Sequence, residues 1–154
     1  MSRERACALL QEFGAQLGIS QLAFDENGNC CLVFDGRILL NLAYEERLKR
    51  FVLFSYLGPA PTPAQGQLLS SLLEANFFWQ GTDGSTLSIE KGSRSAVLMR
   101  DLPLAGLDLS MLMDAVESFV NTAEAWMGRI EAGGDAPATL RAARRVDQQF
   151  GMRV

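Results

Sequence analysis

The stretch Leu72–Glu90, LLEANFFWQGTDGSTLSIE, carries the local signals that decide the fold. It starts as the apolar end of a helix and runs into three adjacent aromatic residues, which a Gly-rich turn follows. From Thr86 onward polar and apolar residues alternate, with Leu87 and Ile89 on one face. This alternation predicts a half-buried strand. A helix, an aromatic corner and a strand are therefore expected in direct succession.

The segments on either side extend this pattern. Residues 62–65, TPAQ, are typical of a helix start, because a capping glutamine and a proline at the first helical position both favour it. The predicted helix runs to about Asn76, and its apolar stripe consists of Leu68, Leu69, Leu72 and Leu73. The strand Ser85–Glu90 is followed by a turn and by a last strand, Ser95–Leu102, which Pro103 ends.

A long third helix is predicted after this sheet. Asp108 or Ser110 can cap its start, and the pair Gly133-Gly134 ends it. Its apolar stripe consists of Leu109, Leu112, Val116, Val120, Ala123, Met127 and Ile130. Residues 133–154 are rich in Ala and Arg, and we expect a mobile or weakly helical C-terminal tail there. The folded domain is assigned to residues 1–132.

The N-terminal part predicts one helix and a series of short strands. Apolar residues at helical spacing place the helix at about 3–17, with Gly18 as its C-cap. Four strands are expected at 22–25, 30–34, 37–42 and 51–56, and Asn27-Gly28 and Asp35-Gly36 mark the first two turns. Residues 44–49 have a helix-favouring composition, but their position between apolar runs favours a strand end and a turn. The resulting order, α-β-β-β-β-α-β-β-α, predicts an α+β fold with a mainly antiparallel twisted sheet and three helices.

Composition excludes several classes of function. The chain has 154 residues and a net charge of −4, which suits a single domain and argues against nucleic acid as a partner. Because it contains no histidine, Ser-His-Asp and Cys-His catalysis and His-containing metal sites are excluded. No phosphate-binding loop is present, and we expect no cofactor. No signal peptide or membrane span is evident, so a cytoplasmic location is expected, with three reduced cysteines.

The segment quoted first resembles the signature of the class I type III secretion chaperones, the Tir-chaperone-like family of Gram-negative bacteria. In that family a helix ending in L-L-x-A-N leads through glycines to a T-L-S-[LI] strand, which Leu72–Asn76 and Thr86–Ile89 match here. The resemblance implies an ATP-independent homodimeric chaperone that is not an enzyme. Such a protein binds the N-terminal region of a secreted effector and keeps it soluble and ready for export.

The resemblance also implies where two copies would meet. In the family, the second helix and the strand after it form the homodimer contact. The matching positions here are Leu69, Leu72, Leu73, Phe77, Phe78, Trp79, Leu87 and Ile89. Large aromatic side chains are enriched in interface cores, because each removes a large area from water. The alternative is that two of the three aromatic rings pack inside the monomer and the third caps the sheet.

A second surface is implied for the effector, through apolar patches and through strand addition to a sheet edge. The candidate patch, on the first helix and the first strands, consists of Phe13, Leu17, Phe24, Leu32, Phe34, Leu40 and Leu42. The alternative is that most of these residues are core. The sequence does not separate the two, because Cys30–Phe34 is apolar on both faces of the strand.

Two other functions stay open. One is a small ligand-binding or hydrolytic α+β domain that uses the carboxylates Asp25, Asp35, Glu45 or Asp101. Such a site requires a pocket with convergent polar groups, whereas a chaperone requires open apolar patches. The other is an adaptor of the secretion apparatus, which would bind a sorting or ATPase component and no effector.

Overall fold

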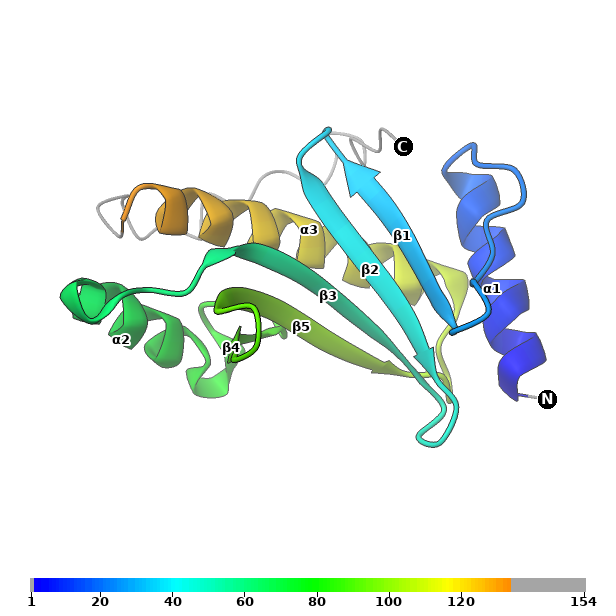
Figure 1. Cartoon of the computed structure of the whole chain (residues 1–154). Helices are drawn as coiled ribbons and strands as arrows, with labels where there is room; N and C mark the ends of the chain where they lie inside the picture. The colour runs from blue at the N-terminus through cyan, green and yellow to red at the C-terminus, as the bar shows by residue number, and fades with distance from the viewer. Residues whose placement is uncertain (1, 134–154) are drawn as a thin grey trace.

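The computed structural model describes residues 2–133, in which three α-helices and five strands follow one another (Figure 1). The bounds are α1 Ser2–Gln16, β1 Asn29–Phe34, β2 Ile38–Glu45, β3 Arg50–Pro59, α2 Gly66–Ala75, β4 Thr86–Glu90, β5 Ser95–Pro103 and α3 Leu109–Glu131. Two single-turn 3-10 helices, η1 at Pro63–Gln65 and η2 at Phe77–Trp79, flank α2. The α+β class and the three expected helices are confirmed. The expected tail lies outside the described residues, apart from Gly133.

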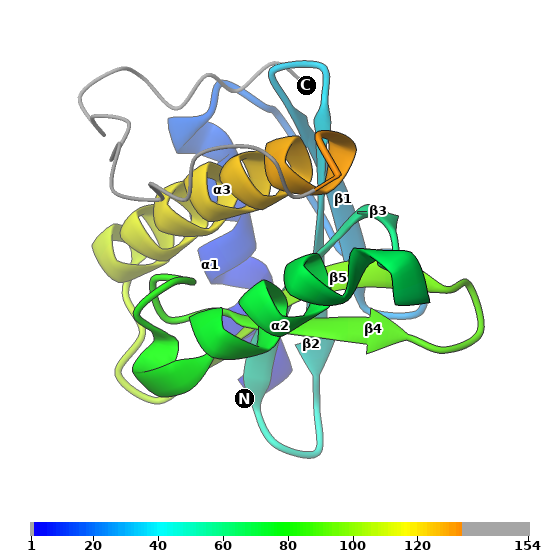
Figure 2. The ribbon, with the colours of Figure 1, turned by 90° about the vertical axis from the view of Figure 1, so that its left-hand side faces the viewer.

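The strands form one antiparallel sheet in the order β1-β2-β3-β5-β4, so β1 and β4 are its edges. Helix α3 packs across β3 and β2 on one face, and α1 packs against α3. Figures 1 and 2 show α1 and α3 on this same side of the sheet, whereas α2 runs beside the edge strand β4. We call the face that α1 and α3 cover the inner face and the opposite one the outer face.

The element ends follow the local signals in the sequence. The Asp108 carboxylate caps α3 by accepting a hydrogen bond from the Met111 N–H at 2.8 Å. Gly18 ends α1 in the left-handed conformation, at φ +72°. The Thr62 N–H donates to Gln65 Oε1 at 2.9 Å, which is the expected glutamine contact of the capping box. The start of α3, the end of α1 and the start of η1 are therefore each set by residues adjacent in the sequence.

The expected strand at 22–25 does not form. Gln21 adopts a positive φ of 62°, and a single backbone hydrogen bond, from Asp25 N–H to Asn29 O, joins the segment to β1 within the described residues. Instead, the Phe24 ring packs toward Phe51, with the ring centroids 5.8 Å apart. The segment is therefore held by packing of this ring on the core, and not by backbone pairing with a neighbouring strand. The other expected strands are present.

The core lies between the inner face and the helices. Leu32, Leu40, Leu53 and Leu98 project from four different strands onto this side and are fully buried. Trp126 of α3 is the largest fully buried side chain of the described residues. Alternation along each strand then leaves the other parity of side chains on the outer face.

Candidate protein-binding surfaces

An aromatic corner, defined as Phe77, Phe78 and Trp79, projects from the end of α2 into solvent. The three side chains are 69%, 72% and 53% exposed. Phe78 and Trp79 also have positive φ angles, 49° and 54°, which are unusual and strained for bulky residues. The surrounding structure therefore maintains a costly backbone conformation in which large apolar rings face water.

Close contacts around this corner hold it in place. A Cβ atom at Gly81 would lie 2.7 Å from Ala75 Cβ and 2.8 Å from Ala75 Cα, so only glycine lets the chain return this close to α2. The Trp79 indole donates to Thr86 Oγ1 at 3.3 Å. The carboxamide of Asn76 bonds both backbone groups of Leu87 in β4, at 2.8 and 2.9 Å. The corner is thus fixed to both neighbouring elements.

The residues expected at a dimer interface separate into two groups. Leu72 and Leu87 are buried, and Ile89 packs partly against the core. Leu69 and Leu73 are 39% and 66% exposed on α2. We call the five exposed residues the corner patch: Leu69, Leu73, Phe77, Phe78 and Trp79. The alternative, with two of the aromatic rings inside the monomer, is wrong for this structure.

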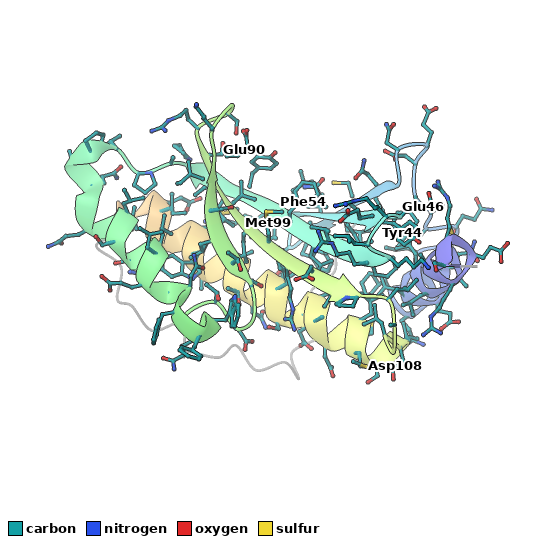
Figure 3. The ribbon with its side chains drawn as sticks, turned by 90° about the horizontal axis from the view of Figure 1, so that it is seen from below. Tyr44, Glu46, Phe54, Glu90, Met99 and Asp108 are labelled. Atoms are coloured by element: carbon teal, nitrogen blue, oxygen red, sulfur yellow. The ribbon has the colours of Figure 1, made fainter. Side chains whose placement is uncertain are left out.

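The outer face of the sheet is a second exposed apolar surface, which the sequence reasoning did not identify. Its larger side chains are Leu39, Phe54, Tyr56 and Met99, of which Phe54 is half-buried and the others are exposed. Phe54 and Met99 are direct partners in the β3–β5 register and lie close together in Figure 3. An antiparallel sheet that faces water normally carries polar residues there. The signal in the sequence was the apolar character of these strands at both parities.

The expected effector patch is largely core, so that assignment requires correction. Its five fully buried members are Phe13, Leu32, Phe34, Leu40 and Leu42. They project onto the inner face or from α1, where α3 covers them, and cannot contact a partner in this conformation. Leu17 and Phe24 are half-buried against the same core. The alternative weighed from the sequence, that most of these residues are core, describes them correctly.

The four carboxylates proposed for a hydrolytic site do not converge on one point, and only Glu45 and Asp101 share a partner. Asp25 accepts the N–H groups of Asn27 and Asn29 in a turn at one end of β1, and Asp35 lies in the turn at its other end. Glu45 and Asp101 both contact Arg50, at 2.8 and 3.6 Å. These contacts explain each carboxylate as part of a turn or an ion pair.

A pocket of about 470 Å³ connects the two exposed surfaces. Trp79 forms its wall on the corner side, and Val52, Met99 and Thr86 belong to the outer face. Arg50 and Asp101, which form an ion pair, lie at its side. The pocket therefore makes the corner patch and the outer face continuous.

The two adjacent cysteines of β1 mark its two faces. Cys30 is buried, and burial raises the pKa of its thiol to about 11, with smaller contributions from the charges of Cys31 and Asp25. Cys31 is exposed on the outer face, and partial burial also raises the pKa of its thiol. None of the three cysteines forms a disulfide in this structure. Within residues 2–133, no helix is long and apolar enough to cross a membrane.

Comparison with known proteins identifies the family to which this sequence is similar. Residues 8–127 match the model of the Tir chaperone protein (CesT) family. The Tir chaperone of Citrobacter freundii is 27% identical over 120 residues, which cover 78% of this chain and 76% of that protein.

Two solved structures share the fold. A chain in the structure of the HopA1–SchA chaperone–effector complex superposes with a TM-score of 0.70 and 23% identity, and the match covers 83% of this chain and 97% of that one. A chain in the crystal structure of the ExsC–ExsE complex gives a TM-score of 0.70 and 20% identity, with coverages of 81% and 92%. The architecture described above is therefore that of these chains.

Proposed function

Because the chain belongs to the Tir chaperone protein (CesT) family, we propose that it is a homodimeric, ATP-independent chaperone of type III secretion. It binds the N-terminal region of a secreted effector in the bacterial cytoplasm and keeps that region soluble and export-ready. It carries out no catalytic step. Beyond the family match, the single structural observation that supports the proposal is the apolar outer face, which no helix of the described residues covers.

The corner patch is the proposed contact between two copies. Monomeric soluble proteins rarely expose contiguous apolar patches of more than a few hundred Å². Here two leucines of α2 continue into three aromatic rings, and two of these rings sit on strained backbone. At about 25 cal/mol per Å², covering one such ring contributes several kcal/mol. A second copy would cover the same patch across a twofold axis.

The outer face and one sheet edge are the proposed effector site. Leu39, Tyr56 and Met99 offer apolar contacts that require no strict sequence in the partner. The edge strand β1 offers backbone groups, because in the described part of the chain its hydrogen bonds to the preceding segment both join Asn29 to Asp25, at the very start of the strand. An extended effector segment would therefore add a strand at β1 and lay its apolar side chains across the adjoining outer face.

Co-expression with the proteins encoded beside this chain tests the function. We expect one of them, or its isolated N-terminal segment, to become soluble and to co-purify with the chaperone. The matched control is the same effector without its N-terminal segment, which should not co-purify. Retention of a sorting or ATPase component in place of any effector would point to the adaptor function and overturn the proposal.

A further inference from the structure

The second edge strand of the sheet, β4, is already occupied by side-chain and loop contacts. In an antiparallel ladder, alternate residues direct both backbone groups to the same side of the strand. At Leu87 the N–H donates to Asn76 Oδ1 at 2.8 Å, and the C=O accepts from Asn76 Nδ2 at 2.9 Å. Leu87 therefore directs its backbone groups away from β5, and one carboxamide takes both places that a neighbouring strand would use.

The positions next in this alternation are Ser85 and Ile89. The Ser85 N–H donates to Thr82 O at 3.1 Å, and the Ser85 carbonyl accepts a hydrogen bond from the Thr82 hydroxyl. Two of the three outward-facing positions are thus closed, and only Ile89 is left for a strand from outside. Strand addition depends on a run of main-chain hydrogen bonds, so a single open position supports little of it.

Asn76 also begins the aromatic corner. Its own carbonyl accepts the Trp79 N–H at 3.0 Å, while its side chain is fixed to β4. Phe78 and Trp79 follow in left-handed backbone, a conformation that persists only where its surroundings determine it strongly. One half-buried residue thus connects the end of α2, the strained turn and the sheet edge.

We propose that Asn76 is a positioning residue that decides how this chain associates. By closing the β4 edge, it prevents pairing of this edge with another strand and leaves strand addition to β1. By anchoring the turn, it holds the corner rings outward, so that two copies meet through side chains. This inference rests on the proposed function, because it assumes that the corner patch joins two copies.

The test uses the full chain with Asn76→Ala, Asn76→Asp and the control Asn27→Ala. Asn27 is an exposed asparagine in the turn before β1, and its loss removes no contact to β4. Asn76→Ala removes both hydrogen bonds to Leu87. Asn76→Asp keeps an acceptor for the Leu87 N–H but places a carboxylate against the Leu87 carbonyl.

Two measurements are made on each variant, amide hydrogen exchange and sedimentation velocity over a dilution series. For Asn76→Ala we expect Leu87 exchange to accelerate and the dimer dissociation constant to rise, each on the order of ten-fold or more. The amide of Leu98, opposite Leu87 on the interior strand β5, should stay unchanged. Asn76→Asp should give intermediate values, and Asn27→Ala should match the unmodified chain.

The outcomes separate this inference from the proposed function. An unmodified chain that stays monomeric at all concentrations removes the proposed dimer itself. A dimeric chain whose Asn76→Ala variant keeps the same dissociation constant and the same Leu87 protection overturns the role of Asn76 alone. Equal acceleration at Leu87 and Leu98 shows a general loss of stability and also overturns it.

Discussion

The indole of Trp126, on the buried face of α3, donates through Nε1 to the carbonyl of Gly81 at 3.0 Å. These residues are 45 positions apart in the chain. The bond joins the core helix to the loop that follows the aromatic corner, and Gly81 itself packs directly against Ala75 of α2. The exposed, strained aromatic corner is thereby anchored to a fully buried residue of the core.

A charge in the corner patch, or the loss of one of its aromatic rings, should weaken the dimer. Phe78→Glu places a carboxylate where the ring is 72% exposed in the monomer, and Trp79→Ala removes the largest ring of the patch. Loss of a central aromatic contact typically costs about 2 kcal/mol or more, so we expect a dissociation constant raised roughly thirty-fold. Sedimentation velocity over a dilution series measures this. The control is Met111→Glu, an exposed apolar residue at the start of α3, which should leave the dimer intact.

A charge on the outer face should weaken effector binding and spare the dimer. Leu39→Glu and Tyr56→Asp each alter an exposed side chain of this face without emptying the core. We expect affinity for the effector segment to fall about ten-fold, because a carboxylate must lose water to enter an apolar contact. Titration calorimetry gives the affinity. Leu48→Glu, in the turn between β2 and β3, is the control, and an equal loss there would contradict the assigned site.

Gly81→Ala should destabilise the chain, whereas Gly66→Ala should not. The new methyl group at 81 would meet the Cβ and Cα atoms of Ala75 within 2.8 Å, and overpacking of this kind typically costs about 1–3 kcal/mol. Gly66 is helical, and a Cβ there meets nothing within 4 Å, so alanine should be neutral or stabilising by up to about 1 kcal/mol. Urea denaturation at one fixed protein concentration compares the free energies of unfolding of the two variants. Equal midpoints for both variants would show that the close approach at 81 is not required.

The two cysteines of β1 should differ in reactivity toward thiol reagents. The thiolate is the reactive form, so the raised pKa of Cys30, about 11, and its burial should keep it unreactive at mildly alkaline pH. Cys31 should label first, at a rate that rises with pH, because its pKa is also raised above the ordinary range.

Mass spectrometry after limited labelling identifies the modified residue. If the effector segment covers the outer face, its addition should slow labelling of Cys31 and leave Cys30 protected as before. Unchanged labelling of Cys31 in the complex would place the effector elsewhere. A Cys31→Ser variant controls for labelling at Cys7, which is half-buried in α1.

Local signals in the sequence were sufficient for most of the secondary structure. The Asp108 cap, the Gly18 helix end and the turn at 35–36 are each set by a few adjacent residues, and the structure has them as predicted. The prediction of a strand at 22–25 was wrong, because the Phe24 ring packs on Phe51, which is far away in the chain. A pattern of short apolar runs does not contain that contact.

The binding surfaces were predictable only in part. Leu72–Glu90 identified the aromatic corner because three adjacent rings at a helix end cannot all enter one core, and all three are exposed. Most residues expected to form the effector patch are buried in the core, on the inner face of the sheet or on α1. Residues 30–34 are apolar at both parities, and period-two alternation alone does not say which parity α3 covers.

The sequence by itself thus determined most of the element types, the family signature and the absence of histidine chemistry, since each depends on adjacent residues or on composition. Only the tertiary structure decided that Leu32 and Leu40 are core while Leu39, Tyr56 and Met99 face water. It also decided that Asn76 reaches the Leu87 backbone. The physical reason is that burial and edge closure arise when α3 and α2 dock against strands that are distant in the chain, and sequence spacing does not encode that docking.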